Sequence, residues 1–150
     1  MGQFLREGLA AGATLPEVFE GAMLRLEERY GARMSALVVA DTSRGAVRIE
    51  LTYGVRPEAF RPRYGLGVAG RVAETGLPIV VPTIRHEPMA LAELSDPSAW
   101  QGEPLSLVCV PVSVHGRCVG ALSIYFSCVP TAVGAPKGSG ATLEARLELA

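Results

Sequence analysis

Two adjacent apolar runs on either side of a two-residue turn limit most strongly how this chain can fold. Leu105 to Val114 and Arg117 to Phe126 are the strongest strand signals in the sequence, and His115-Gly116 lies between them. Strands joined by such a turn form a β-hairpin, which we expect at the centre of an antiparallel sheet. Pro111 lies inside the first run and cannot donate a hydrogen bond to a neighbouring strand. A bulge or a locally missing pairing is therefore expected there.

The first third of the chain predicts a helix followed by another hairpin. Thr14 precedes Leu15-Pro16-Glu17, which is a helix-start signal because proline and an acidic residue occupy the first turn. Apolar residues then recur at spacings of three and four until Gly31. These residues are Leu15, Phe19, Ala22, Leu26 and Tyr30. Two short strand signals follow, Ala36 to Asp41 and Val47 to Tyr53, and residues 42–45 join them as a hairpin.

The middle of the chain contains shorter elements and a long loop. Val68 to Thr75 predicts two helical turns, and Ile79-Val80-Val81 predicts a short strand. From Thr83 to Glu103 no period is sustained and prolines interrupt any long helix, although short helical turns around Met89 to Leu94 fit the pattern. Long structured loops in compact domains tend to be functional. We therefore expect this one to form a lid over a pocket.

The order of elements is helix, hairpin, short helix, strand, lid, hairpin and helix. This order predicts an α+β domain with a central antiparallel sheet of about five to six strands flanked by helices. A length of 150 residues, 49% of them apolar, fits one compact domain over 1–150. Its core is expected at about 15–126. A helical pattern starts near Ala141 and is still running at Ala150, so we expect the natural protein to continue.

Composition and charge argue against several classes of function. The run from Cys118 to Pro136 has no charged side chain, but it alternates and contains glycines and prolines, which favours a strand and a loop over a membrane span. The first residues do not resemble a secretory signal, so a cytoplasmic location is expected. The net charge is −1 with scattered basic residues, which argues against direct nucleic-acid binding. The three cysteines form no CxxC pair, so we predict no metal site and no cofactor.

The segment Gly65-Leu66-Gly67-Val68-Ala69-Gly70 matches the dinucleotide fingerprint G-x-G-x-x-G. Its surroundings argue against that function, because the fingerprint should directly follow a long buried strand and open a βαβ unit. Here a loop rich in arginine and proline precedes it. The alternative is a tight glycine turn that opens a helix at Val68. The exposed N–H groups of that helix start either bind an anion or are capped by water.

Three blocks together resemble the GAF domain family, which has a PAS-like fold. Residues 65–82, from Gly65 through Glu74-Thr75-Gly76 to Pro82, resemble its glycine turn, helix and "ETG-P-I-VP" strand. Residues 107–112 resemble its "S-L-x-x-V-P-V" strand, and residues 119–124 its "V-G-A-L-S-I" strand. The similarity extends to the amino-terminal domain of nif-specific regulatory proteins and related sigma-54 activators. It implies a regulatory sensory domain that controls an ATPase and a helix-turn-helix; no Walker A motif occurs in these 150 residues.

The special chemistries of GAF subfamilies fit this sequence poorly. Cyclic-nucleotide binders resemble one another in a motif that needs asparagine, which the sequence lacks. Bilin attachment uses a thiol usually followed by histidine, and no cysteine here precedes one. Free methionine sulfoxide reductases carry a thiol where this chain has Ala69, although Cys109 and Cys118 remain. We expect no enzyme activity, with sulfoxide reduction kept as a minor alternative.

The resemblance implies a pocket between the sheet and the lid. Its candidate lining residues are Arg71, Thr83, Arg85, Met89, Trp100, Cys109 and Ser123. Two guanidinium groups, of Arg71 and Arg85, suit a carboxylate, and we expect a small anionic metabolite such as a 2-oxo acid. Both arginines equally fit ordinary surface positions, and Trp100 fits an anchor that packs the lid on the core.

A ligand-free interaction module is the competing hypothesis. In it, the helix Leu15 to Tyr30 pairs with the helix after Ala141 to form a homodimer that transmits the signal of a regulatory partner protein.

Overall fold

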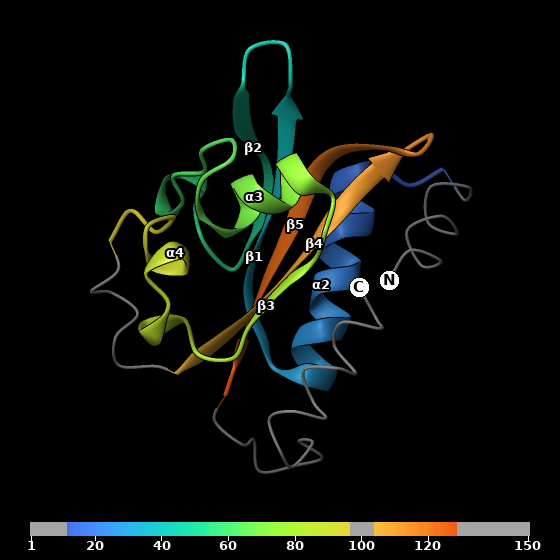
Figure 1. Cartoon of the computed structure of the whole chain (residues 1–150). Coiled ribbons are helices and arrows are strands. Elements are labelled where there is room, and N and C mark those ends of the chain that lie inside the picture. The colour runs from blue at the N-terminus through green and yellow to red at the C-terminus, as the bar shows by residue number, and fades with distance from the viewer. Residues whose placement is uncertain (1–11, 97–103, 129–150) are drawn as a thin grey trace.

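The computed structural model describes residues 12–96 and 104–128, which form one antiparallel sheet with helices on both faces (Figure 1). The strand order across the sheet is β2-β1-β5-β4-β3. The strands are β1 (Ala32–Asp41), β2 (Ala46–Tyr53), β3 (Ile79–Val81), β4 (Leu105–Val114) and β5 (Arg117–Ser127). The helices are α2 (Leu15–Tyr30), α3 (Gly67–Thr75) and α4 (Pro88–Leu91), and single turns of 3-10 helix occupy Pro57–Ala59 and Ile84–His86. The predicted α+β class is confirmed, with five strands among the described residues.

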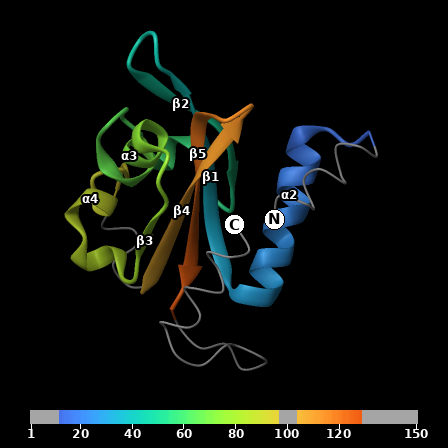
Figure 2. The same cartoon turned by 45° about the vertical axis from the view of Figure 1, so that its right-hand side comes forward.

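The domain has three layers, with α2 on one face of the sheet and α3 and α4 on the other (Figure 2). Alternate residues of each strand serve the two faces, so two separate apolar clusters form. One contains Phe19, Met23 and Leu26 of α2 with Val108 of β4 and Ile124 of β5. The other contains Val68, Val72, Leu94, Leu107 and Tyr125, and it fills the layer between α3, α4 and the sheet.

Helix α2 begins and ends where the sequence predicts. The Thr14 hydroxyl accepts a hydrogen bond from the Glu17 N–H at 3.4 Å, and the Glu17 carboxylate accepts one from the Thr14 N–H at 2.9 Å. This capping box satisfies two N–H groups that the helix cannot bond itself. Gly31 ends the helix with a φ of 73°. Most of the apolar stripe faces the sheet, but Leu15 is 40% exposed.

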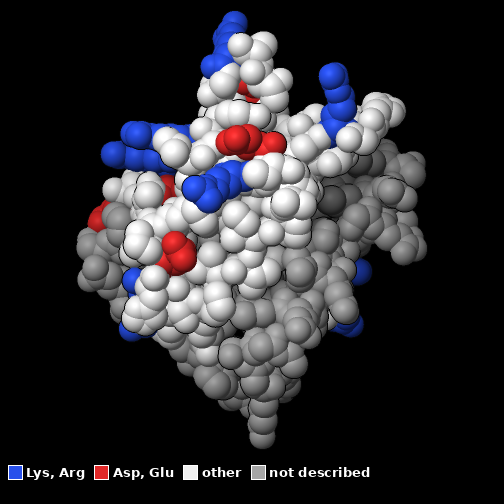
Figure 3. Space-filling view, viewed as in Figure 1, with Lys and Arg blue, Asp and Glu red and all other residues white. Residues whose placement is uncertain are grey.

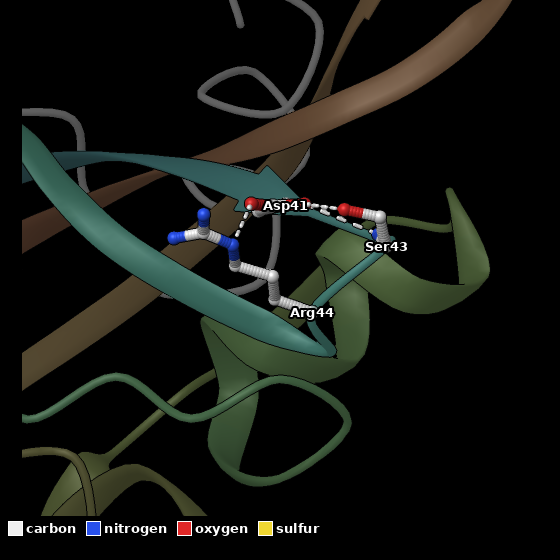
Figure 4. A network of polar contacts seen from close by, with 3 residues as sticks. All are labelled: Asp41, Ser43 and Arg44. Atoms are coloured by element: carbon white, nitrogen blue, oxygen red, sulfur yellow. Dashed lines mark hydrogen bonds and ion pairs between the residues drawn. The ribbon is translucent and has the colours of Figure 1, made fainter.

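The first hairpin is confirmed, although β1 begins at Ala32, four residues before the predicted strand. Its turn is organised by Asp41 (Figure 4). The Asp41 carboxylate accepts hydrogen bonds from the Ser43 N–H at 3.1 Å and the Ser43 hydroxyl at 2.6 Å, and Arg44 Nε lies 3.6 Å from its other oxygen. Such a local side-chain to backbone bond is typical of aspartate in turns.

The second hairpin is also confirmed, with a missing pairing at Pro111 on one side of β4 and a bulge one residue beyond it. Pro111 lies opposite Ala121 in regular register, and the register shifts between Val112 and Ser113. Strand β3 begins opposite Cys109, so within the described residues β4 has no paired neighbour on that side at Pro111. A residue without an N–H is tolerated at such an edge position.

The central elements follow the sequence closely, apart from the lid. Helix α3 starts one residue before the prediction, and β3 has the predicted bounds. The predicted lid contains one turn of 3-10 helix and the four-residue α4, and its part beyond Asp96 lies outside the described residues, as does the helix predicted from Ala141. No helix in residues 12–96 and 104–128 is long and apolar enough to span a bilayer.

Candidate functional site

Two predicted site residues, Cys109 and Ser123, lie together in the sheet beneath α3. They are directly opposite each other on β4 and β5, and the Ser123 hydroxyl donates to the Cys109 sulfur at 3.3 Å. Both side chains are buried. Burial raises the pKa of the Cys109 thiol to about 12, so this thiol stays neutral and poorly nucleophilic at neutral pH.

The other predicted site residues lie nearer the surface. Thr83, at the start of the predicted lid, and Met89, within it, are half-buried. Arg71 on α3 and Arg85 on the 3-10 turn are exposed. In Figure 3 basic side chains project from the face that carries α3 and the loop before it. Trp100 lies outside the described residues.

A side chain that the sequence analysis missed, Glu93, contacts the start of α3. Leu66 precedes this helix and offers no side chain to cap it. Glu93 comes from the loop after α4, and its Oε1 accepts a hydrogen bond from the Ala69 N–H at 2.5 Å. The backbone N–H groups of Val68 and Gly70 also interact with this carboxylate. A carboxyl from a distant segment therefore occupies the helix start that the sequence assigned to an anion or to water.

Two glycines of the fingerprint-like segment make this arrangement possible. A Cβ on Gly67 would lie 2.6 Å from Glu93 Cγ and 2.8 Å from its Oε1, and the φ of Gly67 is +70°. A Cβ on Gly70 would lie 1.7 Å from the backbone oxygen of Arg63. Gly67 thus leaves room for the Glu93 side chain, and Gly70 lets α3 pack closely on the preceding loop.

The Glu93 carboxyl is buried in apolar surroundings. Glu93 is 5% exposed, and its neighbours in the chain Ala90 and Leu94 belong to the apolar cluster beneath α3. Burial raises its pKa from 4.5 to about 7, and the backbone N–H groups of Ala69, Gly70 and Val68 only partly offset this effect. Glu93 takes no part in the ion pair of Arg44 with Asp41 or in that of Arg48 with Glu50.

The backbone around Glu93 joins the lid to the loop between β2 and α3. The Arg61 N–H donates to the Glu93 carbonyl at 2.7 Å, and the Ser95 N–H donates to the Ala59 carbonyl at 2.8 Å. Phe60 and Leu94 form a β-bridge, and the Phe60 ring stacks on Tyr125 with a centroid separation of 5.8 Å. Glu93 is therefore attached to α3 by its side chain and to a second loop by its backbone.

One sequence signal points toward this contact. The glycine turn opens a helix with Leu66 where a capping residue such as serine or aspartate is usual. That absence implies a partner from elsewhere in the chain or from solvent. No spacing rule selects Glu93 among the acidic residues, because it lies 24 positions beyond Ala69 in a segment without periodicity.

Comparisons with known proteins agree with the motifs. A family model described as "GAF domain" matches residues 12–132. The Nif-specific regulatory protein of Azospirillum brasilense is 39% identical over 125 residues, which are 81% of this chain and 19% of that protein. This chain thus spans about a fifth of the length of such relatives.

Two solved structures share the fold. The GAF domain of A. aeolicus nlh2, solved in an inactive state, has a TM-score of 0.67 at 19% identity, covering 90% of this chain and 76% of that one. The free methionine-R-sulfoxide reductase of Neisseria meningitidis, solved with its substrate, has a TM-score of 0.56 at 20% identity, covering 88% and 77%. At these identities the similarity establishes the fold alone.

Proposed function

The chain belongs to the GAF domain family, and on this premise we propose that it is the regulatory sensory domain of a cytoplasmic bacterial transcription regulator. The observation that carries the proposal is the 39% identity to a Nif-specific regulatory protein over 81% of this chain. The output that it controls is proposed to be an ATPase with a DNA-binding segment. A Walker A motif and a terminal helix-turn-helix encoded in the same gene would support this output, and a kinase or cyclase domain would replace it.

The surroundings of Cys109 and Ala69 fit a regulatory role better than thiol-based catalysis at these two positions. A thiol-based reductase needs a reactive thiolate, whereas Cys109 is buried with a pKa of about 12. Ala69, at the position where the resemblance places the reductase thiol, is a buried alanine of α3. An assay for methionine sulfoxide reduction tests this view, and measurable turnover would refute it.

The signal is proposed to be a small anionic metabolite such as a 2-oxo acid. Because Glu93 already contacts the N–H groups at the start of α3, the negative charge of such a ligand needs other partners. Arg71 and Arg85 are proposed to supply them, with Met89 and Thr83 at the lid and Cys109 with Ser123 below.

Thermal unfolding of the chain with a panel of 2-oxo acids tests this binding. Ligand at 100 times its dissociation constant should add about 2.7 kcal/mol to the free energy of unfolding, which raises the midpoint by several degrees. Arg71→Gln and Arg85→Gln should weaken the shift, whereas Arg48→Gln, an exposed residue of β2, should preserve it. If no member of the panel moves the midpoint, the ligand proposal is wrong.

A second candidate function, homodimerisation, is favoured by one exposed apolar residue on α2. Leu24 is 47% exposed, and at helical spacing it lies opposite the buried stripe of α2. Leu26 is 8% exposed within the core cluster of α2 and the sheet, so it is not available for a dimer contact. Light scattering of the wild type and of Leu24→Asp tests the proposal: a wild-type monomer, or a dimer unchanged by the substitution, would exclude this interface.

A further inference from the structure

The Glu93 carboxyl is a buried, ionisable contact between the lid and α3. We define the lid segment as residues 88–95, from Pro88 to Ser95. Its one buried acidic side chain among the described residues is Glu93, whose carboxyl reaches the Ala69 N–H. The lid segment is also attached by the backbone hydrogen bonds of Arg61 and Ser95 and by the pairing of Phe60 with Leu94. These contacts do not depend on pH near neutrality.

We propose that the Glu93 carboxyl is a proton-dependent latch: the lid segment is closed on α3 while the carboxyl holds its proton, and it opens when the proton is lost. This inference goes beyond the proposed function, because it requires neither a ligand nor a particular output domain.

The direction follows from burial. In the closed position Glu93 is 5% exposed and its carboxyl lies against the buried start of α3, so its charged form has lost most of its hydration. When the lid segment moves away, the carboxyl regains water. Loss of the proton therefore favours the open position, even though the ionised carboxylate accepts hydrogen bonds from α3. The raised pKa of Glu93, about 7, agrees with this balance.

Groups in the sheet near Glu93 do not titrate in the same range. Cys109 on β4 and Tyr125 on β5 both lie within electrostatic reach of Glu93. Burial raises the pKa of Cys109 to about 12 and that of Tyr125 well above its ordinary value. Both groups therefore stay neutral between pH 6 and 8.

The charged groups on the other surrounding elements lie toward solvent. They are Arg71 and Glu74 on α3, Glu58, Arg61 and Arg63 on the loop before it, and Arg85, His86, Glu87 and Asp96 beside the lid segment. All are exposed except Glu87, which is half-buried and accepts a hydrogen bond from the Met89 N–H at 3.3 Å. Exposed charges are screened by water and salt, so they bias the latch weakly. His86 carries an imidazole on the turn that precedes the lid segment, so it is given its own control variant.

Hydrogen exchange of the α3 amides measures the opening. With a pKa of 4.5 for the open carboxyl and about 7 for the closed one, proton linkage raises the equilibrium constant for opening about tenfold between pH 6 and pH 8. This increase should appear in peptides that cover residues 66–75 and 88–95, after correction for the intrinsic pH dependence of exchange.

Three variants assign the effect to one carboxyl. Glu93→Gln keeps the shape but cannot ionise, so its corrected exchange should be independent of pH. Glu87→Gln and His86→Gln should both keep the tenfold increase. The latch is refuted if Glu93→Gln retains the wild-type pH dependence, or if either control variant removes it.

A measurement on the unmodified protein covers the case in which Glu93→Gln fails to fold. The carboxyl carbon of Glu93 can be titrated by carbon-13 NMR in the native chain. A midpoint near 7 supports the latch, and a midpoint near 4.5 overturns it.

Discussion

Replacing Gly67 by alanine is the most direct test of how α3 and Glu93 fit together. Gly67 has a φ of +70°, and the added methyl group would lie 2.6 Å from Glu93 Cγ. No real Cβ contact is that short, so the Glu93 side chain must move away from the helix start. The Ala69 N–H then loses its acceptor in a buried position.

The expected loss of stability has two parts. A left-handed backbone costs a residue with a Cβ about 1 kcal/mol. Loss of the cap and of its buried hydrogen bond costs about 2 kcal/mol more. Gly67→Ala should therefore lower the free energy of unfolding by about 3 kcal/mol. Gly31→Ala is the matched control: Gly31 has a φ of +73°, an added Cβ there would meet no atom within 4 Å, and the substitution should cost only about 1 kcal/mol.

Urea denaturation of the two variants measures this difference. A third variant, Gly67→Ala with Glu93→Ala, removes the atoms that clash. In the Glu93→Ala background the glycine substitution should cost only about 1 kcal/mol, which leaves about 2 kcal/mol of coupling between the two positions. If Gly67→Ala and Gly31→Ala are equally destabilising, or if the double variant is additive, Gly67 does not make room for Glu93.

Three further predictions concern pH, a turn and α2. Because folding raises the pKa of Glu93 from 4.5 to about 7, its stabilising contribution is complete below pH 4.5 and is lost as the pH rises through 7, a total of about 3 kcal/mol. Urea midpoints at pH 5 and pH 8 should show this loss in the wild type and not in Glu93→Gln. His115 has a φ of +50°, so His115→Asn should stabilise the chain by about 0.5 kcal/mol in thermal unfolding. Leu26→Asp should destabilise it by more than about 3 kcal/mol, whereas Leu24→Asp should change circular dichroism and stability little.

The fold could be predicted largely from local signals. The helix start after Thr14, the turn His115-Gly116 and the strand patterns of β4 and β5 each depend on a few residues, and each appears where expected. The form of the irregularity at Pro111 has a non-local cause. Whether β4 is at an edge there depends on where β3 begins, and the pairing of Ile79 with Cys109 is not encoded in the neighbouring residues.

The candidate site was less predictable than the fold, because its contacts also depend on residues that are far apart in the sequence. Cys109 and Ser123 lie on the two strands of one predictable hairpin, but their direct pairing also depends on the bulge between Val112 and Ser113, which shifts the register by one residue. The charge of Arg71 and Arg85 suggests an anion-binding role. Both side chains are exposed, so this role is a proposal. Glu93 was missed because burial of a carboxyl depends on the whole layer between α3 and the sheet, which no window of sequence contains.

The likeness of the glycine segment to a phosphate-binding fingerprint now has a physical explanation. The segment of this chain and the phosphate-binding fingerprint both require glycines that leave the first N–H groups of a helix open to a negative or polar group. In a nucleotide-binding protein that group arrives with the ligand, whereas here the chain supplies it from Glu93. The same local pattern therefore has two outcomes, and the distinction depends on a residue far along the chain. An uncapped helix start after a glycine turn should accordingly be examined together with every acidic residue in the loops that fold over it.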